Sequence, residues 1–348
     1  MRRVGLIGAG GIVQRTHALG YDALRGVAQV VALADPAEAT RAGAGERFGV
    51  PPGQRYADYR DLLARAPVDT VVIATPHALH AAQAIAAAEA GKAIVSEKPM
   101  AVMLEEADAI LAAVARHGVP YTVVHNLLFS QPVLGARALL ARGDLGDVLL
   151  GRGEMLGNKA VATTTPELDW RASRKMGGGA VIDSAYHEIY TVEALMGSPV
   201  RVVQARLATL KFPIDVDDTA LLTFEHANGS LSTVTAAWHA RGPAHRGRWV
   251  WINGSAGALR LVYGDPAPLS RSGGPGGWET VDVGSLPGVA PGLAGDGTGH
   301  GAFLRAAFEA LEGGQAPPVS GAQARHNLAL IVAAGEASAG RRAVEVAA

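Results

Sequence analysis

The stretch VGLIGAGG at positions 4–11 is a short apolar run that leads directly into a glycine-rich turn. An apolar run of this length is typical of a strand that helices cover on both faces. Gly8 and Gly10 hold the first two positions of a G-x-G-x-x-G pattern, whose backbone turns tightly and offers helix N-terminal amides to a pyrophosphate. Val13 stands at the third position, where a smaller residue is usual, so the match is incomplete. The stretch predicts a strand, a phosphate-binding turn and a helix.

A carboxylate at the end of the next apolar run strengthens this interpretation. Asp35 follows the run ALA at 32–34, where it could bind the ribose hydroxyls of an adenine dinucleotide. The same charge would repel a 2′-phosphate, and no arginine immediately follows, so we expect NAD rather than NADP. The alternative is that Asp35 is an ordinary turn residue before a proline. The residues predicted here to bind the cofactor are Gly8, Gly10, Gly11, Ile12 and Asp35.

The rest of the first 125 residues alternates short apolar runs with alanine-rich segments of helical period. Strands are expected at 30–33, 70–73 and 93–95, and helices at 78–90 and 104–117. This alternation predicts an α/β fold with a parallel, Rossmann-type sheet over residues 1–125.

Residues 126–348 have a different pattern and are expected to form a second domain for substrate binding and oligomerisation. Longer alternating segments separated by turns predict a large, mostly antiparallel open sheet. The expected strands are 148–156, 200–210, 220–224, 231–238, 249–252 and 258–262. One helix is expected at 180–196, and two closing helices at 302–311 and 322–339 either complete this domain or pack back on the first. Residues 264–300 are rich in glycine and proline and are expected to form loop, with one strand at 279–283.

Composition narrows the classes of function. A chain of 348 residues with 49% apolar side chains can bury two cores. A net charge of -1 with 18% charged residues gives no basic field for nucleic acid or an anionic membrane surface. The absence of cysteine excludes disulfides, thiolate zinc sites and a cysteine nucleophile, and fits a cytoplasmic protein. No apolar run approaches the roughly 20 residues of a membrane helix.

Several motifs occur in a fixed order along the chain. They are ATPHALH at 74–80, EKP at 97–99, DWR at 169–171, GGG at 177–179 and an aspartate and a histidine at 183 and 187. In these motifs the sequence resembles the Gfo/Idh/MocA family of oxidoreductases. The resemblance implies a Rossmann domain, a C-terminal α/β domain with an open sheet, and a nicotinamide lying between them. It implies further cofactor contacts from Thr75, Pro76, His77, His80, Glu97 and Lys98.

The resemblance also implies that Lys98 and Asp183 contact a reacting hydroxyl while His187 acts as acid and base. The residue types agree with these roles. The ordinary pKa of histidine, near about 6.5, suits proton transfer, and a lysine can stabilise a developing alkoxide. On the predicted helix, Asp183 and His187 are four residues apart and share one face. Each residue alone would fit a surface contact or a loop cation equally well; their joint occurrence behind a dinucleotide turn favours catalysis.

The sequence departs from the family pattern at three places. His77 stands where asparagine is common, Ser96 replaces a common cysteine, and Tyr190 stands where an aspartate often follows the histidine. These departures bear on the substrate more than on the reaction.

Further polar residues are weaker candidates for substrate contact. They are Asn126, Glu154, Lys159, Trp170, Arg171 and His300. A metal site from His77, His80, His125 and His187 lacks the spacing of known ligand motifs, so no metal is predicted.

These observations predict an NAD-dependent oxidoreductase that moves a hydride between nicotinamide and a hydroxyl of a polyol, inositol or sugar-like substrate. Two alternatives stay open: an NAD-dependent lyase or glycosidase that oxidises its substrate only transiently, and a non-catalytic dinucleotide-dependent sensor. Related proteins commonly pair through the open face of the second sheet, which would otherwise expose an apolar patch, so a homodimer or homotetramer is expected.

Overall fold

The computed structural model describes residues 1–24, 26–157, 169–240, 247–263, 268–273, 276–290, 292 and 296–347. The chain forms two compact units. The first unit comprises residues 1–126 and 293–328, and the second comprises 127–292 and 329–348. Residues 293–328 therefore return to the first unit, although most of the chain after 126 belongs to the second.

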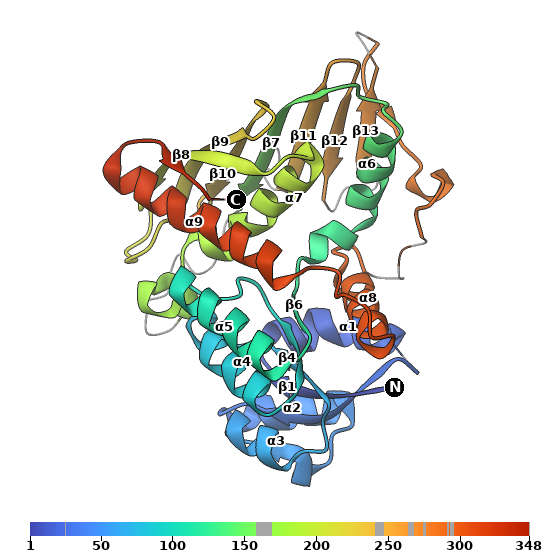
Figure 1. Cartoon of the computed structure of the whole chain (residues 1–348), viewed down its shortest axis with the longest axis vertical. Coiled ribbons are helices and arrows are strands. Elements are labelled where there is room, and N and C mark those ends of the chain that lie inside the picture. The colour runs from blue at the N-terminus through green and yellow to red at the C-terminus, as the bar shows by residue number, and fades with distance from the viewer. Residues whose placement is uncertain are drawn as a thin grey trace. The chain divides into compact units, whose positions relative to one another are not determined.

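The first unit contains a six-stranded sheet in which every strand pair is parallel (Figure 1). Its strands are β1 (Arg2–Ile7), β2 (Ala28–Ala34), β3 (Arg55–Tyr56), β4 (Thr70–Ile73), β5 (Ala93–Ser96) and β6 (Tyr121–Val123). The order β3-β2-β1-β4-β5-β6 is that of a doubly wound dinucleotide-binding fold. The strand order reverses between β1 and β4, which is where such folds bind their ligand.

Helices follow most of these strands. They are η1 (Val13–His17), α1 (Ala18–Ala23), α2 (Glu38–Phe48), α3 (Tyr59–Arg65), η3 (His77–Leu79), α4 (His80–Glu89), α5 (Leu104–His117) and α8 (His300–Glu312). The helix after the glycine turn contains a π-helical stretch, η1. Helix α8 packs on α1, where a Cβ on Gly20 would lie only 3.0 Å from the Cα of Gly301. This close approach brings the start of α8 back to the first unit.

The second unit is built on a nine-stranded sheet with the order β14-β13-β12-β11-β7-β10-β9-β8-β15. Its strands are β7 (Val148–Leu156), β8 (Val200–Ala208), β9 (Thr219–His226), β10 (Leu231–Ala237), β11 (Gly247–Gly254), β12 (Ala258–Val262), β13 (Leu269–Ser272), β14 (Glu279–Thr280) and β15 (Val344–Glu345). Among the described residues, neighbouring strands are antiparallel except for β7 and β10, which are parallel. The predicted α/β fold with a parallel sheet and a second, mostly antiparallel sheet is confirmed.

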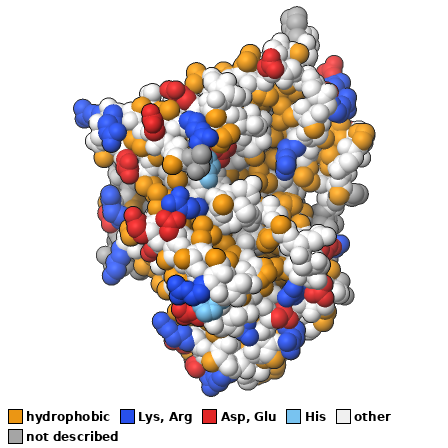
Figure 2. Space-filling view, in the orientation of Figure 1, with side chains coloured by type: hydrophobic (Ala, Val, Ile, Leu, Met, Phe, Trp, Pro, Cys, Tyr) orange, Lys and Arg blue, Asp and Glu red, His pale blue; other side chains and the backbone are white. Residues whose placement is uncertain are grey.

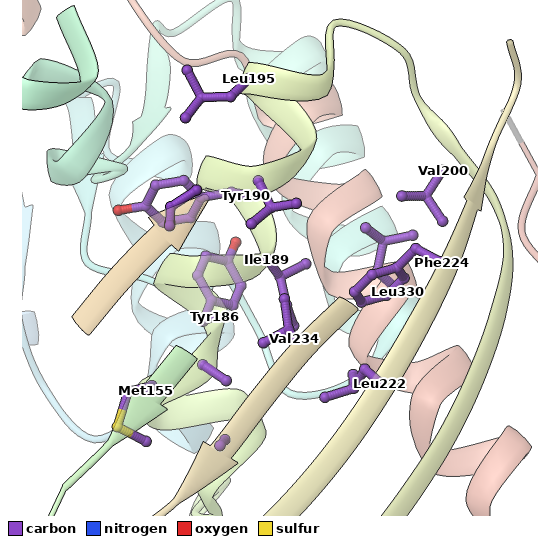
Figure 3. Packing of buried hydrophobic residues seen from close by; sticks show 14 of the residues in the cluster. Met155, Tyr186, Ile189, Tyr190, Leu195, Val200, Leu222, Phe224, Val234 and Leu330 are labelled. Atoms are coloured by element: carbon purple, nitrogen blue, oxygen red, sulfur yellow. The ribbon is translucent and has the colours of Figure 1, made fainter. Parts of the chain in front are cut away.

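Helices cover one face of this second sheet. They are α6 (Gln131–Ala141), α7 (Tyr186–Met196) and the later part of α9 (Gly321–Gly340), with shorter turns at η6 (Trp170–Ala172), η7 (Arg174–Met176), η8 (Ala180–Ala185) and η10 (Val283–Ser285). Figure 3 shows Ile189 of α7 packed near Val234, Leu222 and Phe224 of the strands and Leu330 of α9. Exposed leucines remain on the strands, among them Leu150, Leu221 and Leu231.

Two expectations about local structure need correction. The helix expected over 180–196 begins as the π-helical turn η8 and becomes α-helical only at Tyr186. In the glycine-rich segment, β13 was not expected, and the strand expected at 279–283 is limited to Glu279–Thr280, followed by η10. Residues 264–267, 274–275, 291 and 293–295 of that segment lie outside the described part of the chain.

Positive and negative side chains are interspersed over the face seen in Figure 2, which agrees with the near-neutral net charge. Within the described ranges, no helix is both long and apolar enough to cross a membrane.

Candidate active site

The glycine turn after β1 presses against the end of β4. Gly8 has a φ of +86°, and a Cβ at this position would lie 2.7 Å from the Ala74 carbonyl oxygen. Only glycine adopts this conformation at little cost and fits the space. By contrast, a Cβ on Gly10 would meet nothing within 4 Å. The turn therefore has no room for a side chain at Gly8 but is open at Gly10, and this openness suits the close approach of a pyrophosphate.

Asp35 ties the end of β2 to this turn. Its Oδ2 accepts a hydrogen bond from Ala9 N (2.9 Å), and its Oδ1 accepts one from Ala37 N (3.0 Å). A carboxylate has further lone pairs that could accept from ribose hydroxyls. The residues present thus fit an adenine dinucleotide.

Two arginines beside this turn were not singled out from the sequence. The Arg15 guanidinium lies over Gly11, where a Cβ would approach it within 2.7 Å. Arg41 Nη1 donates to the carbonyl oxygen of Asp35 (2.7 Å). Arg15 adds positive charge where a pyrophosphate would lie, whereas Arg41 fixes the main chain after β2. Arg15 follows the glycine turn and Arg41 follows Asp35, each at a helical spacing, and this spacing is the sequence signal that could have identified them.

His80 lies beneath the loop that carries Thr75 and Pro76. Its ring is fully buried, with Nδ1 2.7 Å from the Pro99 carbonyl oxygen and Nε2 2.9 Å from the Thr75 carbonyl oxygen. Burial lowers the pKa of His80, so the ring is neutral and donates to one carbonyl at a time. In this arrangement His80 supports two loops of the site rather than facing a ligand. His77 is also buried, with its ring centroid 5.8 Å from that of His80.

Glu97 is the centre of a buried polar network next to Lys98. Its Oε1 accepts from His17 Nε2 (2.7 Å) and lies 3.5 Å from His300 Nε2, and its Oε2 accepts from the Lys98 backbone N–H (3.2 Å). Burial favours the neutral acid, but the hydrogen bonds from His17 and His300 hold the pKa of Glu97 well below its usual range. Glu97 is therefore a carboxylate, and the half-buried Lys98 follows a chain segment that this network fixes in place.

This network was only partly anticipated. Glu97 and His300 were expected near cofactor and substrate, but His17 was missed, because a single histidine in an alanine-rich helix gives no local signal. The three residues place one ligand atom each within 4.8 Å of one another, which is also compatible with a metal ion. These are not the histidines that the sequence suggested as a possible metal set. Of those, His125 is buried, and burial lowers its pKa to about 3.

Asn126 follows β6 and faces the start of α8. Its Nδ2 donates to the Thr298 carbonyl oxygen (2.8 Å), whereas its Oδ1 is buried and has no hydrogen-bond partner among the described residues. Thr298 in turn bonds His300 Nδ1 through its hydroxyl (3.1 Å). Asn126 and His300, both expected to contact substrate, are thus joined within the first unit.

In the second unit, the triple glycine shapes the approach to η8. A Cβ on Gly178 would overlap the carbonyl group of Arg171, and Gly179 has a φ of +123°. Asp217 bonds the start of η8: its Oδ2 accepts a hydrogen bond from Val181 N (2.8 Å). Burial raises the pKa of Asp217 to about 6. The glycines therefore let η8 begin directly against the turn that carries Arg171.

Two side chains bond the Asp183 carboxylate on η8, and a third supports one of them. Arg171 Nε donates to its Oδ1 (3.3 Å) and Ser184 Oγ donates to its Oδ2 (2.9 Å). Ser184 Oγ accepts from Trp238 Nε1 (2.9 Å). The Arg171 guanidinium also lies 4.3 Å from the centre of the Trp170 ring. The structure thus brings together three of the predicted residues, Trp170, Arg171 and Asp183.

His187 is half-buried at the start of α7, and its Nδ1 shares a hydrogen bond of 2.9 Å with the Tyr190 hydroxyl. Since Asp183 lies in a π-helical turn, four residues no longer correspond to one α-helical turn. The predicted contact between Asp183 and His187 stays a prediction.

Glu154 lies on β7, on the face of the sheet opposite to α7. Gly151 and Gly153 of β7 face α7, because a Cβ on either would contact Val192. Side chains alternate along a strand, so Glu154 lies on the opposite face, where it pairs with Arg152 Nη2 (2.5 Å). The expectation that Glu154 lines the substrate cavity stays a prediction. Lys159 lies outside the described residues.

The chain was compared with known proteins. Residues 2–125 match an oxidoreductase family with an NAD-binding Rossmann fold, and residues 133–260 match the Gfo/Idh/MocA C-terminal domain. A levoglucosan dehydrogenase from Pseudarthrobacter phenanthrenivorans is 33% identical over 294 residues, which cover 75% of this chain and 73% of that protein. A D-xylose 1-dehydrogenase (NADP+) from Haloarcula marismortui is 26% identical over 59% of this chain and 57% of that protein.

Solved structures agree with these matches. A levoglucosan dehydrogenase in complex with NADH and levoglucosan has a TM-score of 0.88 and 28% identity, with 100% of both chains covered. The chain therefore belongs to the Gfo/Idh/MocA family of oxidoreductases, and its first unit is an NAD-binding Rossmann domain.

Proposed function

We propose that this protein is an NAD-dependent dehydrogenase that oxidises one hydroxyl of a sugar or polyol, with His187 as the acid and base. The observation that carries the proposal is the polar arrangement at η8 and α7. An aspartate, paired with Arg171, lies four residues before a half-buried histidine. Relatives with such substrates support it: one is a levoglucosan dehydrogenase and another a D-xylose dehydrogenase.

The proposed reaction removes a hydride and a proton from the same alcohol. Bound NAD+ supplies the hydride acceptor. The hydroxyl proton passes to His187, the carbon–oxygen bond becomes a carbonyl, and His187 becomes an imidazolium. Lys98 would stabilise the negative charge that develops on the oxygen, and Asp183 would orient the hydroxyl. In the reverse direction, the imidazolium returns its proton to the alkoxide.

NAD is proposed as the cofactor in preference to NADP because the Asp35 carboxylate would repel a 2′-phosphate. The Arg41 guanidinium is already bonded to the main chain at Asp35, so it is not placed as a dedicated phosphate ligand. One relative is an NADP+-dependent dehydrogenase, so the preference of this protein for NAD+ over NADP+ has to be measured.

Self-association is proposed through the open face of the second sheet. Leu150, Leu221 and Leu231 occupy adjacent strands on that face, and their exposed fractions are 41%, 57% and 46%. Several exposed leucines on one face of a sheet are typical of a surface that another copy covers.

The roles are tested by steady-state kinetics of His187→Ala and Lys98→Met, with levoglucosan, D-xylose and myo-inositol as alcohols. Each variant should lower kcat by roughly 10²–10⁴-fold, the usual contribution of a positioned acid–base or charged group. The dissociation constant of NAD+ should stay nearly constant in His187→Ala, because the turn that binds it belongs to the first unit. His117→Ala removes an exposed histidine of α5 and serves as control. Normal turnover in His187→Ala would exclude this residue as the base.

A further inference from the structure

Tyr190 connects the proposed base to the main chain of the second unit. The Leu127 backbone N–H donates to the Tyr190 hydroxyl oxygen (3.1 Å), and the same hydroxyl shares the 2.9 Å hydrogen bond with His187 Nδ1. Tyr190 is only 2% exposed, and its ring packs edge-on against Tyr186 with centroids 5.8 Å apart. Figure 3 shows both tyrosines projecting from α7. The position of the hydroxyl is thus fixed from two sides.

The Tyr190 hydroxyl is uncharged throughout the working pH range. Burial raises the pKa of Tyr190 well above its ordinary value. The charged or titratable groups that influence it are Glu188 on α7, Arg248 on β11 and Tyr263 after β12; Asp183 lies on the preceding element, η8. Of these, Arg248 and Glu188 pair with each other (3.4 Å). His187 Nδ1 therefore faces a neutral oxygen.

A neutral oxygen and a carboxylate have different effects on an imidazole. A carboxylate at this position would attract the positive charge of the imidazolium and hold the proton on the ring to higher pH. A hydroxyl accepts the Nδ1 hydrogen without that charge, and it can also donate when the ring is neutral. In the tautomer in which the hydroxyl accepts the Nδ1 hydrogen, the lone pair of the neutral ring lies on Nε2.

We propose that Tyr190 is a positioning residue: its hydroxyl accepts the Nδ1 hydrogen of His187, which orients the ring and selects the tautomer in which Nε2 can take the substrate proton. This inference rests on the proposed function of His187. It assigns a role to the residue at which the chain departs from the aspartate common in its family.

The first test compares Tyr190→Phe with Tyr263→Phe, using the most active of levoglucosan, D-xylose and myo-inositol. Phenylalanine keeps the buried ring and removes only the hydroxyl. Loss of one neutral hydrogen bond to His187 should lower kcat about three- to tenfold while NAD+ affinity stays unchanged. Tyr263→Phe removes another hydroxyl near α7 and should leave kcat unchanged. In a His187→Ala background, Tyr190→Phe should cause no additional loss.

The second test uses charge. In Tyr190→Asp, the acid limb of the kcat/KM profile should move to higher pH by about one unit, because the new carboxylate stabilises the imidazolium. Melting temperatures show whether the variant is folded, and if it is not, Tyr190→Phe decides the question alone.

The outcomes separate the two proposals. If His187→Ala keeps a normal acid limb, the proposed function itself fails. If His187→Ala loses the limb but Tyr190→Phe has normal kcat, or loses no more than Tyr263→Phe, the role of Tyr190 is overturned and that of His187 stands.

Discussion

Arg171 Nε donates to Asp183 Oδ1 across 3.3 Å, although the two residues are twelve positions apart and lie in separate helical turns. The contact is possible because Gly178 lets the chain pass directly against the Arg171 carbonyl group. The short helical turn η6 thus places a cation beside the aspartate of the proposed site.

The first prediction concerns this close approach. Gly178→Ala should lower the free energy of unfolding by roughly 1–3 kcal/mol, because the added Cβ overlaps main-chain atoms that cannot move easily. Gly43→Ala on α2 is the matched control, since a Cβ there meets nothing within 4 Å and alanine favours the helix. Urea titration measures both. Equal stability of the two variants would show that the glycine is not needed for space.

The second prediction concerns cofactor choice. NAD+ should bind more tightly than NADP+, and Asp35→Ala should narrow the difference, because the variant no longer repels a 2′-phosphate. Fluorescence titration of both cofactors measures it, with Asp58→Ala on the surface of the first unit as control. Equal affinities in the unmutated protein would contradict the role of Asp35.

The third prediction concerns the buried Glu97 network. The pKa of Glu97 is depressed in the folded state, so its contribution to stability is complete at neutral pH and disappears as the pH falls below about 4.5. Without cofactor, Glu97→Gln should lower the free energy of unfolding by roughly 1.5–3 kcal/mol at pH 7, as expected for hydrogen bonds to a charged group. The difference from the unmutated protein should stay nearly constant from pH 7 to about pH 5 and shrink below about pH 4.5. A difference that grew as the pH fell from 7 to 5 would mean that Glu97 is protonated in the folded protein.

The fourth prediction concerns metal. His17, Glu97 and His300 could hold an ion, yet a direct hydrogen bond of 2.7 Å already joins His17 to Glu97. Prolonged dialysis against EDTA should therefore leave turnover and melting temperature unchanged. Loss of activity that added Zn²⁺ restores would assign a metal site to this network instead.

The fifth prediction concerns the open sheet face. Analytical ultracentrifugation should show a dimer or tetramer, and the double substitution of Leu150 and Leu221 by arginine should shift the mass toward the monomer. Met103→Arg, an exposed apolar residue of the first unit, should leave the mass unchanged. A monomeric unmutated protein would remove the proposed interface.

The sequence predicted the two sheets well because each has a direct signature. Strands buried on both faces must be apolar throughout, and the run before Gly8 is of this kind. Alternating segments of the second half predicted a sheet with one open face. The face of the sheet on which each side chain lies was harder to predict, since alternation defines two faces but does not show which one a helix covers. The pattern therefore assigned Glu154 to neither face, although the neighbouring glycines Gly151 and Gly153 mark the face that α7 approaches.

Other parts of the site depend on contacts that no local pattern encodes. His17 of η1 meets Glu97, which follows β5 and lies eighty positions away in the chain. Likewise, the partnership of Tyr190 with Leu127 spans sixty-three positions. Sequence identified the residue types of the proposed chemistry, whereas the groups that orient them required the fold.

The most direct test of the account is the absorbance of the nicotinamide during turnover. The protein, NAD+ and a panel of levoglucosan, D-xylose and myo-inositol should give NADH in a one-to-one ratio with the carbonyl product, and Lys98→Met should lower that rate by roughly 10²-fold or more. A sugar product formed without net NADH would instead indicate transient oxidation, as in a lyase or glycosidase. NAD+ binding with no product from any sugar or polyol would contradict the assignment as a dehydrogenase.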